Sequence, residues 1–321
     1  MNAEQLGFEG MPQRLYSCTP SRLNNWLDCP RRYRMTYLDR PQPPKGPPWA
    51  HNSLGASVHN ALAAWWRLPE PRRTVEMSGT LLLRGWLTDG FRDAGQSEAW
   101  RTRAREMVEA YVSGLDPHTE PVGVERTVAT RTDVIALSGR IDRLDETASG
   151  PGTELVVVDY KTGRRALTAD DARGSLALAL YAIAASRMLR SPCRRVELHH
   201  LPTGGVAAWE HTEESLLRQL GRAERIAVEA RDADEAYRTR LAVPQPRQPR
   251  RPERSRRSQG PEGPERRDGA GAPVDHEPFD EVFPPRPGRL CAWCDFSRHC
   301  PEGRQAAAPA EPWAALAETS A

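Results

Sequence analysis

The chain has 321 residues, of which 38% are hydrophobic, and its formal net charge at pH 7 is +2. This content can bury one large core or two modest ones, and the small net charge excludes an overall electrostatic signal for nucleic-acid binding. The sequence has no signal-like start and no apolar run of membrane-spanning length. We therefore expect a cytoplasmic protein with no membrane partner.

Short helices and a stiff linker are predicted near the N-terminus. Thr19 and Pro20 are typical of a helix N-cap and first turn, and they predict a short helix that Cys29 and Pro30 end. A second short helix follows, and the proline-rich residues 41–48 predict a stiff linker. These elements place Cys29 at a junction between two helices.

An α/β pattern covers the next part of the chain. Ser53 is expected to cap a helix over residues 55–66, and the apolar periodicity predicts another helix over about residues 99–115. Runs rich in β-branched residues predict a meander of strands over residues 122–130, 134–144 and 155–160. The remaining expected elements are a helix over 170–189, a hairpin over 196–201 and 206–209, and a long helix starting near Thr212.

Residues 244–287 change abruptly to proline, arginine and glycine. Without a periodic apolar pattern this insert cannot bury enough surface to offset its ordering, so we expect it to be disordered. Eight arginines between Arg247 and Arg267 make it basic. A solvated linker is favoured over a dedicated DNA-binding arm, with some nonspecific attraction to phosphate. Residues 305–321 are expected to form a flexible tail.

The spacing of the cysteines points to a metal centre. Six cysteines in a protein expected in a reducing compartment argue against a disulfide framework, and Cys18 and Cys193 are expected to be free thiols. The other four are a C-terminal Cys-x2-Cys-x5-Cys group and one N-terminal residue: Cys291, Cys294, Cys300 and Cys29. Three thiolates need a fourth ligand, and Cys29 is the best candidate. Spacing alone does not distinguish zinc from an iron–sulfur cluster.

Two carboxylates and a lysine lie at the ends of the central strands. The period of two puts Asp142 on the side of its strand away from Ile141, and Asp159 and Lys161 emerge side by side from the next strand. Such a set can hold Mg²⁺ or Mn²⁺, activate a water molecule and stabilise phosphate charge. Ordinary salt bridges at a hairpin end are the alternative interpretation, and they would be preferred for Asp-x-Lys taken alone.

Several motifs in order resemble the RecB family of PD-(D/E)XK nucleases. The resemblance is clearest in two segments, Gly139-Arg140-Ile141-Asp142-Arg143 and then Val158-Asp159-Tyr160-Lys161-Thr162-Gly163. The opening helix of that family and its first cluster cysteine are similar to Ser21-Arg22-Leu23 through Cys29-Pro30-Arg31-Arg32-Tyr33. Its histidine-bearing helix is similar to Gly55-Ala56-Ser57-Val58-His59. The resemblance covers nearly the whole chain apart from the insert and the tail.

The resemblance implies a restriction-endonuclease-like fold, in which helices flank a mixed central sheet, and metal-dependent DNA cleavage. By this resemblance Asp142 and Asp159 would bind the metal with His59, Lys161 would be the catalytic lysine, and Tyr181 would match a tyrosine of the active site. A lone histidine on an apolar helix is otherwise usually structural. The family often has a glutamine four residues before this tyrosine, whereas this chain has Ala177. Glu125 could add a carboxylate, although a surface strand glutamate explains it equally well.

The resemblance also implies a [4Fe-4S] cluster on the four cysteines, like that of AddB-type and CRISPR-associated members. We expect a nuclease body over residues 1–243, including the first cluster ligand, and a segment over 288–304 that closes the cluster against the N-terminal helices. The expected function is a DNA exonuclease that acts on DNA ends or single strands in repair or recombination. No Walker-type motif is present, so a separate helicase or repair partner would supply any unwinding. The competing hypothesis is a noncatalytic DNA-binding or assembly protein.

Overall fold

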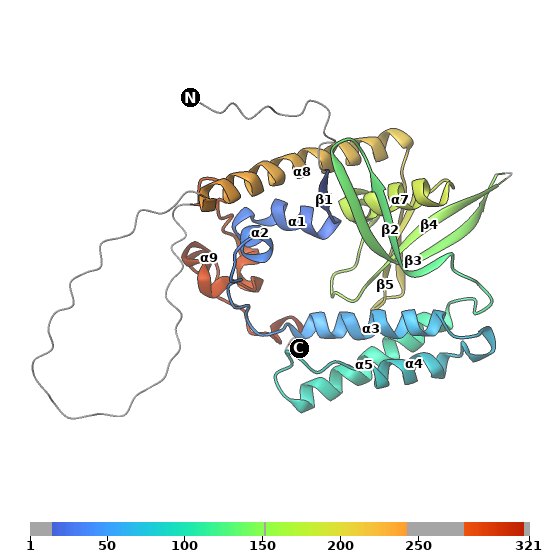
Figure 1. Cartoon of the computed structure of the whole chain (residues 1–321). Helices are drawn as coiled ribbons and strands as arrows, with labels where there is room; N and C mark the ends of the chain where they lie inside the picture. The colour runs from blue at the N-terminus through green and yellow to red at the C-terminus, as the bar shows by residue number, and fades with distance from the viewer. Residues whose placement is uncertain (1–14, 151, 243–278, 318–321) are drawn as a thin grey trace, which may run out of the picture.

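The computed structural model describes residues 15–150, 152–242 and 279–317. In this part of the chain a mixed six-stranded sheet lies between layers of helices (Figure 1). The strands are β1 Tyr16–Cys18, β2 Gly123–Arg131, β3 Ile135–Ser149, β4 Gly152–Lys161, β5 Arg195–His200 and β6 Gly205–Glu210. The helices are α1 Pro20–Asp28, α2 Pro30–Tyr37, α3 Ala50–Trp66, α4 Val75–Arg84, α5 Ala94–Ser113, α6 Ala169–Gly174, α7 Leu176–Leu189, α8 Glu213–Ala242 and α9 Pro301–Ala306.

Strand β3 organises the sheet because it has three partners. It pairs in parallel with β1 and antiparallel with β2 and β4. Strand β4 then pairs in parallel with β5, and β5 pairs antiparallel with β6. The connection from β4 to β5 runs through α6 and α7, as a parallel crossover requires. The expected mixed central sheet flanked by helices is therefore confirmed.

Two helical layers bury opposite faces of β4. Val156 and Val158 pack with α3, α4 and α5, whereas Leu155 and Val157 pack with α6 and α7. All four side chains are at most 5% exposed, as expected for a strand covered on both faces. A third cluster joins α1, α2 and α8 to the other side of α7 and includes Tyr33, which is 0% exposed. The sheet is thus held rigidly from both sides.

The C-terminal segment packs against the N-terminal helices, as Figure 1 shows for α9 beside α2. Arg31 of α2 is only 1% exposed, and its guanidinium forms ion pairs with Asp280 and Glu302. Trp49 donates a hydrogen bond from Nε1 to Asp295 Oδ1 over 2.8 Å. These contacts bring together parts of the chain that are more than 240 residues apart in sequence.

Parts of the chain expected to lack order are packed. Phe283, inside the predicted disordered insert 244–287, is 0% exposed and contacts Trp26 and Tyr237 edge to face. Leu316, in the predicted flexible tail 305–321, is 4% exposed, and its carbonyl accepts a hydrogen bond from Trp100 Nε1. Both predictions are wrong for residues 279–287 and 305–317, because these apolar side chains complete the core. The rest of both segments lies outside the described residues.

The boundaries of other elements also differ from the sequence-based predictions. Helix α3 begins at Ala50 rather than after Ser53, whose hydroxyl donates to the carbonyl of Asp89. The helix expected over 170–189 is divided at Ser175, which N-caps α7. Helix α4 and strand β1 were not predicted. Across the described ranges, no helix combines the length and the apolar character needed to span a bilayer.

Candidate active site

A cavity of ≈ 480 Å³ opens between α3, β3 and α7 near the middle of the sheet. It is lined by side chains from elements far apart in the sequence, among them His59, Glu125, Arg140, Asp142 and Tyr181. The N-terminal end of α1 closes another part of the wall through Thr19 and Ser21. Three residues that the sequence singled out for the nuclease site, His59, Asp142 and Tyr181, therefore line one cavity together with Glu125.

Asp142 lies where the β3 and β4 strands separate. Their ladder ends at the pair Arg143 and Val158, so the next positions in register, Asp142 and Asp159, are no longer paired. Beyond this fork β4 pairs only with β5 among the described strands. Asp142 Oδ2 accepts the backbone N–H of Tyr160 over 2.9 Å, and so replaces the missing carbonyl partner of the opened strand. The fork thus fixes one carboxylate oxygen and leaves the cavity open beside it.

His59 faces this carboxylate from α3. Its Nε2 lies 3.1 Å from the carbonyl oxygen of Tyr160, which can only accept, so Nε2 carries the proton in the neutral imidazole. Its Nδ1 then directs a lone pair at Asp142 Oδ2, 3.3 Å away. Two acceptors at this separation require a proton or a cation between them. Burial acts to lower the pKa of His59, but the hydrogen bond and charge of Asp142 outweigh burial, and the pKa is raised.

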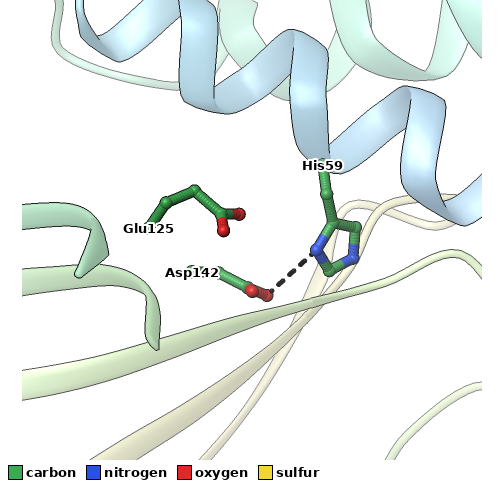
Figure 2. Close-up of side chains that lie close together, drawn as sticks. All are labelled: His59, Glu125 and Asp142. Atoms are coloured by element: carbon green, nitrogen blue, oxygen red, sulfur yellow. Dashed lines mark ion pairs between the residues drawn. The ribbon is translucent and has the colours of Figure 1, made fainter. Parts of the chain in front are cut away.

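Glu125 completes a group of three potential metal ligands (Figure 2). His59, Glu125 and Asp142 each offer one ligand atom, and these atoms lie within 4.8 Å of one another. Two oxygen or nitrogen ligands about 2.1 Å from one ion at right angles are about 3 Å apart, so small side-chain movements would suit Mg²⁺ or Mn²⁺. Within the described residues this is the single such group of three or more ligands.

The backbone of Glu125 explains why its side chain enters the cavity. Its φ angle is 50°, which is unusual for a residue other than glycine inside a strand, and it has no partner in the β2–β3 register. This local distortion is of the kind found where a strand redirects a side chain toward a site. The Glu125 carboxylate is 16% exposed and forms an ion pair of 2.8 Å with Arg140 Nε. The sequence raised Glu125 as a possible carboxylate at the site but did not favour this role over that of a surface strand glutamate.

Asp159 and Lys161 lie beside the three-ligand group without belonging to it. Their side chains form an ion pair, and the lysine is 45% exposed. Burial raises the pKa of Asp159 despite the opposing charge of Lys161, and the nearby Asp142 charge adds to the increase. Asp159 and Lys161 also influence the pKa of His59. The expected carboxylates and lysine are therefore neighbours, but the ligand group contains Glu125 in place of Asp159.

Tyr181 of α7 lines the same cavity as His59. Its ring lies directly over the backbone of β3, because a Cβ atom placed on Gly139 would be 2.3 Å from Tyr181 Cε1. Burial, assisted by the charges of Asp159 and Asp142, raises the pKa of Tyr181 to about 12. The phenol is therefore protonated at neutral pH and can donate a hydrogen bond. Ala177, one turn earlier on the same helix, offers no polar group where the family often has glutamine.

The family model described as the PD-(D/E)XK nuclease superfamily matches residues 17–301, which include every residue of this site. The chain belongs to this superfamily. Membership supports nuclease activity, a DNA substrate and divalent-metal chemistry. No curated protein matches the sequence of this PD-(D/E)XK nuclease.

Among solved structures, one similar chain is described as "Putative exonuclease" from Eubacterium rectale. It is 11% identical, with a TM-score of 0.39, and the match covers 72% of this nuclease and 90% of the other chain. At that TM-score we infer nothing further from the likeness.

A second cavity of this nuclease, of ≈ 350 Å³, is lined by all four cysteines expected to bind a cluster: Cys29, Cys291, Cys294 and Cys300. Backbone N–H groups of Gly288 and Gly303 each lie 3.4 Å from a cysteine sulfur, and Arg31 Nη1 donates to Cys300 Sγ over 3.4 Å. Such donors stabilise thiolates. Burial raises the pKa of Cys294 to about 11, so proton loss there requires a bound cation. None of the six cysteines forms a disulfide, and Cys18 and Cys193 are buried.

The spacing of these sulfurs tests which centre would fit. Four thiolates around zinc, each about 2.3 Å from the metal, lie about 3.8 Å from one another. Within the described residues no three of the cysteine sulfurs lie within 4.8 Å of one another. The sulfurs are therefore not already gathered as zinc ligands would be, and cysteine thiolates are donors that both zinc and iron–sulfur clusters use.

Proposed function

We propose that this protein is a Mg²⁺- or Mn²⁺-dependent DNA exonuclease of the RecB and AddB kind, which hydrolyses phosphodiester bonds at DNA ends or in single strands. The single observation that carries the proposal is the group of His59, Glu125 and Asp142, with Asp159 and Lys161 beside it. We place its action in DNA repair or recombination, where a separate helicase would supply unwound strands.

His59, Glu125 and Asp142 would hold the divalent cation, and Asp159 is proposed as a further ligand across the fork in the sheet. When bound, the cation supplies an activated water and neutralises phosphate charge. The hydrogen bond from Tyr160 N–H holds Asp142 in one orientation, and the Tyr160 carbonyl does the same for His59. Such orienting contacts reduce the cost of organising the ligands.

Lys161 would orient the attacking water and stabilise the charge that develops on the phosphate. Its 45% exposure leaves the ammonium group accessible to a strand of DNA, while its ion pair with Asp159 keeps it at the fork. Tyr181, protonated at neutral pH, can donate a hydrogen bond to a phosphate oxygen. The arrangement needs no covalent intermediate on the protein.

The test is cleavage of end-labelled single-stranded and duplex DNA by anaerobically purified protein with Mg²⁺, Mn²⁺ or a chelator. Asp142→Asn should abolish cleavage and weaken Mn²⁺ binding but preserve folding, because the amide oxygen can take the place of Oδ2 and still accept from the Tyr160 N–H. Asp232→Asn, at a 61% exposed carboxylate on α8, is the matched control. Metal-dependent DNA binding without any cleavage by the wild-type protein would favour the noncatalytic alternative.

We also propose that Cys29, Cys291, Cys294 and Cys300 share one [4Fe-4S] cluster that joins the nuclease body to the segment over 288–304. The four-cysteine cavity and its N–H donors support a shared thiolate centre, and the family resemblance favours the cluster over zinc. The cluster would act mainly as a structural clasp, because its first and last ligands are far apart in sequence.

Metal analysis tests the clasp directly. Cys29→Ser should lose iron and acid-labile sulfide together with the brown colour and much of the thermal stability, whereas Cys193→Ser should keep its iron. Zinc at one equivalent in place of iron would refute the cluster and retain the clasp. Full iron content in Cys29→Ser would refute the shared site.

A further inference from the structure

Arg140 is the residue at the candidate active site to which neither the sequence nor the family match assigns a role. Its side chain is 70% exposed, whereas the Glu125 carboxylate that it contacts is only 16% exposed. The guanidinium therefore lies at the mouth of the cavity, with its partner inside. A guanidinium has five N–H donors, and a contact through Nε leaves others directed toward solvent.

The charges around the cavity give Arg140 its importance. Among the described residues that line it, Arg140 carries the single guanidinium or ammonium group, beside the carboxylates of Glu125 and Asp142. A DNA strand that enters this cavity brings phosphates close to these carboxylates. Arginine binds phosphate through paired, charge-assisted hydrogen bonds, so Arg140 is placed to offset that repulsion.

Arg140 and the divalent cation also compete for Glu125. The carboxylate that offers a ligand atom to the metal group is the same carboxylate that pairs with Arg140 at 2.8 Å. A cation bound to Glu125 weakens the hold of this carboxylate on the guanidinium. A phosphate that binds the guanidinium likewise frees Glu125 for the cation.

We propose that Arg140 is a substrate-positioning residue that exchanges Glu125 for a phosphate of the DNA strand, so that DNA and the divalent cation strengthen each other's binding. This inference rests on the proposed nuclease function and deepens it. The exchanged contact is an ion pair with one solvent-exposed partner, so the coupling should be modest, roughly two- to fivefold. By linkage, DNA must tighten Mn²⁺ binding by the same factor as Mn²⁺ tightens DNA binding.

The experiment measures Mn²⁺ affinity by the electron paramagnetic resonance signal of free Mn²⁺, with and without a single-stranded oligonucleotide. Lys161→Ala is used as the background so that the DNA stays intact. In this background DNA should tighten Mn²⁺ binding roughly two- to fivefold, and Arg140→Gln should remove that dependence. Without DNA, Arg140→Gln should bind Mn²⁺ as tightly as the background or more tightly, because Glu125 has lost its competitor.

Steady-state cleavage in the otherwise wild-type protein gives an independent readout. Arg140→Gln should raise KM for DNA roughly tenfold with a smaller change in kcat, since a phosphate contact is worth about one such factor. Arg140→Lys should recover part of the loss in KM because it keeps the positive charge. The matched control is Arg195→Gln, which removes a comparable Nε contact of 2.6 Å to the 15% exposed Glu197 on β5.

The outcomes separate this inference from the proposed function. Weaker Mn²⁺ binding by Arg140→Gln without DNA would show that Arg140 only holds Glu125 in place, and would overturn the exchange. An unchanged KM in a wild-type protein that cleaves DNA would also overturn it. Coupling between Mn²⁺ and DNA in a protein that never cleaves DNA would support the exchange and reject the nuclease.

Discussion

Replacing Gly139 with alanine should displace Tyr181 and damage the candidate active site while leaving the metal group intact. The added Cβ would lie 2.3 Å from Cε1, 3.1 Å from Cδ1 and 3.4 Å from Cζ of the Tyr181 ring. Carbon atoms pack at about 3.5 Å or more, so the ring must retreat by roughly 1 Å. The strand cannot easily yield instead, because Gly139 is paired with Val128 of β2. Overpacking of this kind costs about 1–3 kcal/mol.

Thermal unfolding and cleavage kinetics together measure the effect. The melting temperature of Gly139→Ala should fall by about 2–4 °C for each kcal/mol, and kcat should fall while Mn²⁺ affinity is unchanged. Gly174→Ala is the control, because its Cβ would meet no atom within 4 Å. In a Tyr181→Ala background the obstacle is gone, so Gly139→Ala should then cost little stability. If the losses of stability in Gly139→Ala and Tyr181→Ala simply added in the double variant, the steric reasoning would be refuted. Wild-type stability and kcat in Gly139→Ala alone would refute it as well.

Three further changes probe the lysine, the clasp and the C-terminal segment. Lys161→Ala should lower kcat by about 10²–10³ with DNA affinity largely retained, and equal kcat would remove this lysine from the mechanism. The hydrogen bond from Arg31 lowers the pKa of Glu302 to about 2, so this carboxylate stabilises the fold above the unfolded pKa of 4.5, and the stabilisation is lost as pH falls toward 2. In acid unfolding, Glu302→Gln should therefore lack the part of the decrease in stability with pH that Glu302 causes. Solvent screening keeps that decrease shallow. Leu316→Ala should lower the free energy of unfolding, measured by chemical denaturation, by about 2 kcal/mol. The control Leu290→Ala, at a 67% exposed side chain, should lower it by less than about 0.5 kcal/mol. Equal losses in the two variants would contradict the packing of Leu316.

Local sequence signals predicted the elements that depend on local contacts. Thr19 caps α1 because its hydroxyl oxygen accepts a hydrogen bond from the Arg22 N–H, as the Thr-Pro pair indicated. The β3–β4 hairpin turns where the polar residues predict it. The predicted start of α3 was wrong because groups far away in the sequence determine where this helix begins. The Ala50 N–H donates to the carbonyl of Pro312, and this long-range contact replaces the local cap that Ser53 was expected to provide.

The site was predicted only in part for a related reason. Strand periodicity and the family resemblance identified Asp142, Asp159, Lys161 and His59, which the structure brings together. The contribution of Glu125 depends on a φ angle of 50°, which no residue type at that position indicates. Helix α4, in contrast, was missed although signals for it existed, since Thr74 caps its first turn and Gly85 follows its last residue.

The pairing of Arg31 with Glu302 sets the order in which the protein can be completed during synthesis. These residues are 271 positions apart, so at about 5–20 residues per second the ribosome makes the acid roughly 14–54 s after the arginine. During that time the Arg31 guanidinium, which is 1% exposed in the folded protein, has neither of its carboxylate partners, because Asp280 is also synthesised long after Arg31. A buried charge without partners is unstable, so we expect the Arg31 guanidinium to stay in solvent until the C-terminal segment has been made. Until then the face of α2 that contacts Asp280 and Glu302 is expected to remain open to water.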